Sequence, residues 1–140
     1  MIDLKWVRAG RALFTVSNPK GERYTFRVAL GKPSEKYPKP SFFVGLLTGP
    51  NNEDDYTYMG VLTDDATLRL TKASKYPVDS APVRVFSWVL RVITGAAALP
   101  PGYNIQHEGK CCRCGRTLTV PESIESGIGS ECASKMGLAS

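Results

Sequence analysis

The hydrophobic pattern of the first seventy residues is that of short strands separated by turns. Between positions 24 and 30 the large apolar side chains occupy the even positions, and Thr, Arg and Ala occupy the odd ones. Residues 12–16 are equally rich in β-forming types, and Asn18-Pro19-Lys20-Gly21 between the two segments fits a type I turn. We therefore predict a β-hairpin with one face toward the core.

Further strands are predicted after a proline-rich loop. Residues 31–40 contain three prolines, which cannot continue a sheet ladder, so an exposed loop is expected there. Residues 41–47 and 56–62 have strand character on either side of a polar turn, and residues 66–71 follow as another strand. Together these segments predict an antiparallel β-meander.

The pattern then changes to the spacing of an amphipathic helix. Apolar residues recur every three or four positions between Val85 and Ile93, and Arg84 and Arg91 lie on the opposite side. Asp79-Ser80 is the predicted cap, and Gly95 the predicted stop. We expect this helix to cover one face of the meander, although such a helix could instead bind a partner or a membrane surface.

A break at Pro100-Pro101-Gly102 precedes a short predicted strand at 103–107. The expected fold is α+β, an antiparallel meander covered by one amphipathic helix, followed by a small zinc-knuckle subdomain. The expected division is a β-rich domain with its helix at 1–99 and a zinc-binding subdomain at 100–140.

The knuckle is predicted from four cysteines, all within residues 111–132. The run His107-Glu-Gly-Lys-Cys111-Cys112-Arg-Cys114-Gly115-Arg contains a C-x2-C pair, which can hold one metal ion from a tight turn. Residues 121–126 are predicted as one short helix stopped by Gly127. Cys132 is expected in the first turn of the next short helix, where free backbone N–H groups favour a thiolate. We predict one structural Zn²⁺ bound by Cys111, Cys114 and Cys132.

A closed tetrahedral site needs a fourth ligand. His107 is preferred, because it can approach the ion from the end of a strand, whereas Cys112 adjoins Cys111 and neighbouring side chains rarely reach one ion together. Cys112, Glu108 and solvent remain alternatives. A different chemistry, a redox dithiol at Cys111 and Cys114, would usually require a helix after the pair, and the sequence there predicts a turn and a strand.

The segment from His107 to Cys132 resembles the C-terminal cysteine motif of a family of uncharacterised phage and bacterial proteins, roughly C-G-x-C-G-R-x-L-T-x-P-x-S-I-x-x-G-x-G-P-x-C. Cys111, Cys114 and Cys132 fall on the cysteines of that motif, over about the last 35 residues. The chain has Cys112 where the family usually has Gly, and Ser130 where it often has Pro. The resemblance implies zinc and a phage or bacterial setting, but it supplies no activity.

Charge adds a candidate binding surface. The chain has a net charge of +5, and residues 1–50 contain nine Lys and Arg against three Asp and Glu. A basic first hairpin suits an anionic partner, and an ordinary solubilising surface is the alternative. The candidate contacts for nucleic acid are Arg11, Lys20, Arg23 and Arg27. The aromatic residues Trp6, Phe14, Tyr24 and Phe26 could stack on bases but are more simply explained as core.

Location and activity are constrained by what the sequence lacks. No apolar run reaches the length of a membrane span, and the N-terminus does not resemble a secretory signal, so a cytoplasmic protein is expected, in the host cytoplasm if phage-encoded. The single histidine, the absence of a phosphate-binding loop and the turn-like setting of the paired aspartates favour a non-enzymatic protein without a small-molecule substrate.

Two functions follow as hypotheses. The first is nucleic-acid binding through the basic N-terminal sheet surface. The second is a protein-interaction module, such as a phage inhibitor or adaptor that docks on a host nucleic-acid-handling or defence complex.

Overall fold

The computed structural model describes residues 2–31, 35, 40–51, 54–118 and 126–136. Most of the loop expected at 31–40 and the helix expected at 121–126 lie outside the described residues. The described helices and strands are, in chain order, α1 (Leu4–Val7), β1 (Arg11–Ser17), β2 (Arg23–Leu30), β3 (Phe42–Leu47), β4 (Tyr56–Leu62), β5 (Leu68–Arg69), α2 (Ala81–Ile93), β6 (Asn104–His107) and α4 (Ser130–Lys135).

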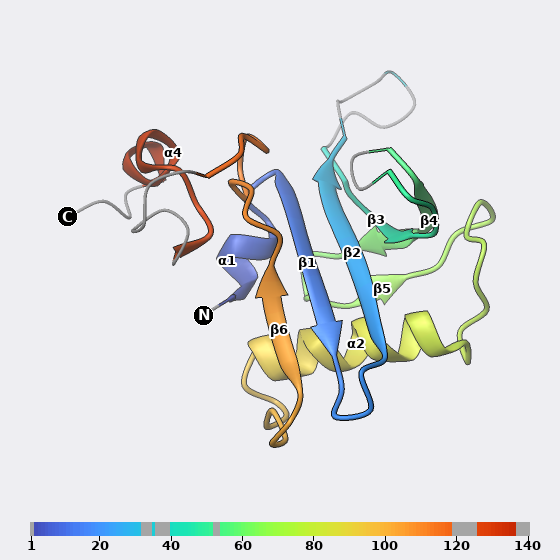
Figure 1. The fold of residues 1–140 in the computed structure, drawn as a ribbon. Coiled ribbons are helices and arrows are strands. Elements are labelled where there is room, and N and C mark those ends of the chain that lie inside the picture. Colours follow the sequence, from blue (N-terminus) through green and yellow to red (C-terminus); the bar gives the residue numbers. More distant parts are fainter. Residues whose placement is uncertain (1, 32–34, 36–39, 52–53, 119–125, 137–140) are drawn as a thin grey trace.

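The strands form one curled antiparallel sheet in the order β5-β4-β3-β2-β1-β6 (Figure 1). The predicted hairpin is confirmed, because β1 pairs with β2 from Arg11 opposite Ala29 to Ser17 opposite Arg23. At its turn, the Gly21 N–H donates to the Asn18 carbonyl at 3.1 Å. The meander is also confirmed, although its last strand shrinks to the two residues of β5.

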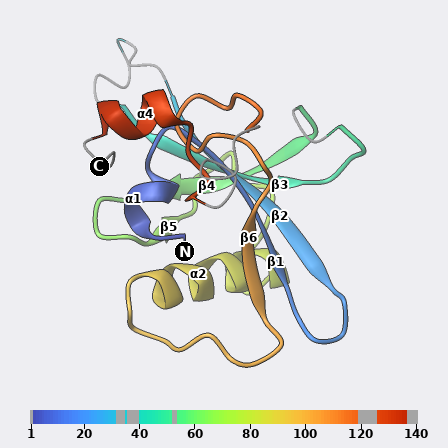
Figure 2. The same cartoon turned by 60° about the vertical axis from the view of Figure 1, so that its left-hand side comes forward.

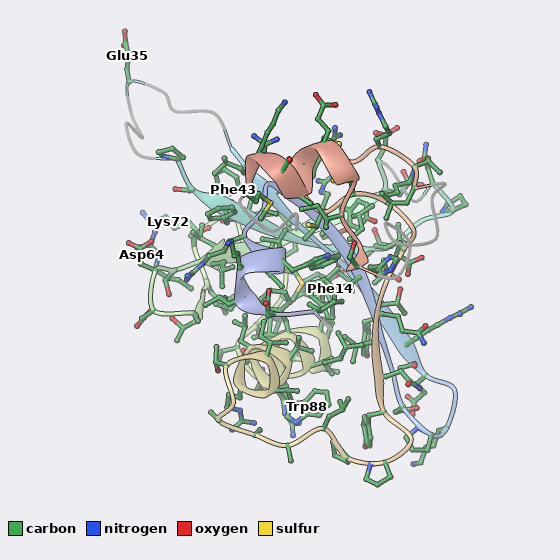
Figure 3. All side chains as sticks on the ribbon, turned by 90° about the vertical axis from the view of Figure 1, so that its left-hand side faces the viewer. Phe14, Glu35, Phe43, Asp64, Lys72 and Trp88 are labelled. Carbon is green, nitrogen blue, oxygen red and sulfur yellow. The ribbon has the colours of Figure 1, made fainter. Side chains whose placement is uncertain are left out.

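One face of this sheet is the hydrophobic core. Phe14, Phe26 and Val28 on β1 and β2 are completely buried, as the alternating pattern predicts. Helix α2 crosses behind β1, β2 and β6 in Figure 1, and Figure 3 shows Phe14 between that helix and the sheet. Phe86 of α2 packs edge-on against Phe26, with ring centroids 5.2 Å apart. Aromatic burial therefore joins the helix to the sheet.

The ends of α2 follow local chemistry. Ser80 occupies the N-cap position, but its hydroxyl donates to the Pro77 carbonyl at 2.7 Å and makes no side-chain cap bond to the helix. Pro82 fits the first turn because its ring needs no N–H donor there. The left-handed Gly95, at φ +85°, follows the last turn. Among the described helices, none is long and apolar enough to cross a membrane.

The short helix α1 was not predicted. It is a single turn, capped by the Asp3 carboxylate, which accepts a hydrogen bond from the Trp6 N–H at 2.8 Å. Trp6 and Val7 enter the core from this turn. Four residues are too few for a helical hydrophobic period to emerge, and the Asp cap is the one sequence signal that could have indicated it.

Strand β6 connects the sheet to the cysteine-bearing segment. It pairs antiparallel with β1, with Phe14 opposite His107 and Ser17 opposite Asn104. Figure 2 shows α1 beside the sheet and α4 beyond it at the same end of the molecule. The expected division between residues 1–99 and 100–140 thus crosses a continuous sheet, and it stays a prediction as a statement about folding units.

Removal of the Phe86 ring should test the packing of α2 on the sheet. We expect Phe86→Ala to lower the free energy of unfolding by about 3–5 kcal/mol, since the site is fully buried and the cavity adjoins two further rings. Ser87→Ala, on the half-exposed side of the same helix, is the matched control and should change little. Urea denaturation followed by circular dichroism measures both, and a Phe86→Ala cost below about 1 kcal/mol would contradict this packing.

Candidate metal centre

The first two candidate ligands lie on a tight backbone turn. Lys110 and Thr117 form an isolated antiparallel bridge at its base. Within it, the Cys111 N–H donates to the Arg116 carbonyl at 2.8 Å, and the Gly115 N–H donates to the Cys111 carbonyl at 2.9 Å. Gly115 has φ +78°, a conformation that favours glycine, so the backbone can reverse directly after Cys114. The predicted knuckle turn is therefore present.

The third candidate comes from α4, as the sequence predicts. Gly129 is the N-cap of this helix, and Cys132 lies in its first turn. The sulfur atoms of Cys111, Cys114 and Cys132 all lie within 4.8 Å of one another. A tetrahedral ion with zinc–sulfur bonds of about 2.3 Å holds its sulfurs about 3.8 Å apart. Each sulfur–sulfur distance would therefore need to shorten by about 1 Å or less for the three thiols to hold a metal ion.

The electrostatic surroundings of Cys111 favour a thiolate. Burial raises the pKa of this thiol, but the backbone N–H groups of Gly129, Cys114 and Arg113 donate to its sulfur, and the net pKa falls to about 7. Hydrogen bonds to a charged form stabilise that form. Backbone N–H groups around a ligand sulfur are also the outer-shell contacts that tune a thiolate metal site.

Cys132 differs in its surroundings but has a charged neighbour. Burial raises the pKa of this thiol, and the Arg113 guanidinium, which donates to the sulfur at 3.7 Å, acts in the opposite direction. A metal ion would remove the cost of holding several sulfurs close together, because it supplies the missing positive charge. Cys114 is exposed, so an ion can reach the cluster from solvent.

Cys112 lies outside this group of three thiols, and its backbone groups hydrogen-bond to other segments. Its side chain is completely buried, and burial raises the pKa of the thiol to about 12. Its N–H donates to the Gly127 carbonyl at 3.0 Å, and its carbonyl accepts from the Arg11 N–H at 2.8 Å. It is thus a buried thiol whose peptide groups connect β1 to the chain before α4.

His107 also lies outside the group of three thiols. Its Nδ1 accepts a hydrogen bond from the Gly109 N–H at 2.9 Å, and its ring centroid lies 6.5 Å from that of Trp6. In the described part of the chain, the three cysteines are the only group of His, Cys, Asp or Glu side chains whose ligand atoms cluster closely enough to hold a metal ion. The fourth ligand is therefore still a matter of prediction.

Trp6 and Gly127 support the site through a contact that the sequence did not predict. The Trp6 indole N–H donates to the Gly127 carbonyl at 3.1 Å in a buried hydrogen bond across 121 positions. Gly127 has φ +75°, and a Cβ there would lie 2.5 Å from Trp6 Nε1. The glycine itself was predicted as a helix stop, but no sequence period could have paired it with Trp6.

The basic candidates lie along the hairpin. Arg11 is exposed at the start of β1. Its side chain packs against the knuckle turn at Gly115, where an added Cβ would lie 3.0 Å from Arg11 Cδ. Lys20 and Arg23 are exposed at the hairpin turn, and the Arg27 guanidinium carbon lies 4.5 Å from the centre of the Tyr56 ring. The aromatic residues near these basic side chains are core residues, as the simpler interpretation of the sequence expects. Trp6, Phe14 and Phe26 belong to the core, and Tyr24 packs against it.

Comparison with known proteins covers this same segment. Residues 105–137 match the model of a family of unknown function (DUF6011). The match agrees with the expected resemblance of the last 35 residues to an uncharacterised family. No curated protein and no solved structure gives a significant match.

Substitution of single cysteines should separate the cluster from its neighbour. We expect Cys132→Ser to lower the metal content well below one ion per chain, because two remaining thiolates leave an incomplete shell. Cys112→Ala, the matched control, should keep its metal and lose about 1–2 kcal/mol of stability from the buried site. Metal analysis of protein purified without chelator measures both, and equal metal content in the two variants would contradict the assignment.

His107→Gln tests the fourth ligand. Because the ring already accepts a hydrogen bond and lies outside the cluster, we expect this variant to retain its metal. Titration with a competing chromophoric chelator measures the affinity. A loss of tenfold or more, about 1.4 kcal/mol, would instead establish His107 as the fourth ligand.

Proposed function

We propose that this chain is a non-enzymatic protein in which one structural zinc ion, bound by Cys111, Cys114 and Cys132, fastens the C-terminal segment to a sheet that binds single-stranded nucleic acid. The observation that supports a bound metal ion is that the three cysteine sulfurs lie within 4.8 Å of one another. Thiolate-rich sites select soft or borderline ions, and zinc is the commonest structural one.

The nucleic-acid surface is the outer face of β1 and β2, defined by Arg11, Leu13, Thr15, Ser17, Arg23, Thr25 and Arg27. These side chains alternate with the buried residues of the core face, so they project to the opposite side of the sheet. In Figure 1 this side faces the viewer, and the described helix α2 lies behind it. The face is mainly polar, and α2 does not cover it.

The spacing of the arginines fits a polymer rather than a small anion. Arg23 and Arg27 are four residues apart on one strand, and Arg11 pairs with Ala29, two residues beyond Arg27. At about 3.4 Å per residue, the three guanidinium-bearing positions extend over about 20 Å. Lys20 adds a further positive charge in the turn of the β1–β2 hairpin. One acidic group, Glu108, accepts a hydrogen bond from Thr15 on the same face.

Aromatic rings continue this face onto the next two strands. Tyr56 lies beneath the Arg27 guanidinium, and Phe43, which is 41% exposed, lies 6.1 Å from the Tyr58 ring. Exposed aromatic rings beside a basic stripe support base stacking in single-strand-binding proteins. These rings replace the buried ones that the sequence suggested.

The zinc knuckle supports this surface because Arg11 lies against its turn. The phage or bacterial setting and the cytoplasmic location rest on the resemblance of the cysteine motif and on the clustered, free cysteines. Docking on a host protein complex through the same face is the competing function.

Neutralising two arginines should weaken nucleic-acid binding without unfolding the protein. We expect Arg11→Gln combined with Arg23→Gln to reduce the affinity for a fluorescein-labelled oligothymidylate at low salt by roughly tenfold. The salt slope should fall by about 1.4, since each lost contact with a single strand contributes about 0.7. Lys72→Gln combined with Lys75→Gln removes the same charge from the exposed turn after β5 and is the control.

Anisotropy titrations at several salt concentrations provide the measurement. The wild-type chain should lose affinity steeply with salt. If it shows no binding at low salt, or if the control pair weakens binding as much as the arginine pair, the nucleic-acid proposal is wrong and a protein partner is favoured.

A further inference from the structure

A groove lies on the core side of the sheet, between α2 and the end of the β1–β2 hairpin. It has a volume of about 690 Å³, within the usual range for a ligand site. Its walls are mainly apolar and include Val16 and Tyr24 of the hairpin, Leu68 of β5, Trp88 of α2, and Tyr103 before β6. Figure 3 shows Trp88 beside α2, next to the loop that leads to β6.

The groove is elongated. Its α2 wall runs from Ala81 through Arg84 and Trp88 to Arg91, which is nearly the whole helix. At 1.5 Å per residue this wall is about 15 Å long, the reach of about five extended residues. A chain-like ligand fits such a shape better than a compact metabolite.

The rim of the groove is positively charged. Arg84 and Arg91 are exposed, lie on either side of Trp88, and have no side-chain hydrogen bond or ion pair among the described residues. They are seven positions apart, so their α-carbons are separated by about 10 Å along the helix. The one acidic residue of the lining, Glu22, is at the hairpin end and accepts a hydrogen bond from Asn18 at 3.3 Å.

Apolar surface at the two ends extends the groove. Val78 is 73% exposed at one end, and Leu99 is 40% exposed next to Pro100 at the other. Contiguous exposed apolar groups beside a pocket mark interaction sites. The Trp88 and Tyr103 rings, with centroids 5.5 Å apart, supply aromatic contact area of the kind that dominates binding hot spots.

We propose that this groove binds a short acidic peptide segment of a partner protein, with apolar side chains in the groove and carboxylates paired to Arg84 and Arg91. Arginine pairs well with carboxylates, and the apolar walls require side chains that a sugar-phosphate backbone does not offer. This site differs from the nucleic-acid face, since its two arginines lie on α2 and its lining shares only Ser17 with that face.

The probe is a fluorescein-labelled synthetic peptide of about six residues in which Asp alternates with Leu and Phe. We expect it to bind the zinc-loaded full chain, and the matched peptide with Lys in place of Asp to fail. Arg84→Gln combined with Arg91→Gln should weaken binding by about tenfold, whereas Lys72→Gln combined with Lys75→Gln should leave it unchanged. The Trp88 indole N–H resonance should shift on binding, and that of Trp6 should not.

Three results would overturn the proposal: no binding of the acidic peptide at millimolar concentration, equal binding of the Lys peptide, or unchanged affinity in the Arg84 and Arg91 variant. Displacement of the peptide by an oligothymidylate in a manner dependent on these two arginines would also overturn it and assign the groove to nucleic acid. Binding of oligothymidylate that leaves the peptide in place separates this groove from the outer face.

Discussion

The Gly127 carbonyl accepts two hydrogen bonds on which the arrangement of the C-terminal segment depends. One comes from the Trp6 indole, and the other from the Cys112 backbone N–H. The Cys112 carbonyl in turn accepts from the Arg11 N–H at the start of β1. Buried polar groups are costly without partners, so this chain of bonds fixes the knuckle turn against α1 and β1. The three thiols meet where that fixed turn approaches α4.

The cysteine cluster and the meander could be predicted because their signals are local. The C-x2-C spacing and Gly115 define a turn, and alternation along β2 defines which face of that strand is buried. Register and long-range contacts were not predictable, because they depend on which segments pack together. The pairing of Trp6 with Gly127, the outer position of Phe43 and the length of β5 are all of this kind.

The two-residue period of the strands also decides which side chains reach the outer face of the sheet. In β2, aromatic residues and arginines are neighbours in sequence, so stacking rings beside the charges stayed open as an alternative to core rings. The two-residue period of a strand instead sends the Phe14 and Phe26 rings to the core and the Arg23 and Arg27 side chains to the opposite side. Among the described residues, rings reach the basic face from β3 and β4, where Gly45 leaves room for Tyr56 to pack across it.

Backbone hydrogen exchange with and without zinc tests the central claim most directly, because it reports each segment separately. On this account, chelation removes the protection of the Cys111, Cys112 and Leu118 amides, whose hydrogen bonds close the knuckle and join it to Gly127. Amides in the β2 and β3 pairing should stay protected, since the aromatic core holds them. Unchanged protection of the knuckle amides after complete removal of metal, or loss of protection throughout the sheet, would contradict the account.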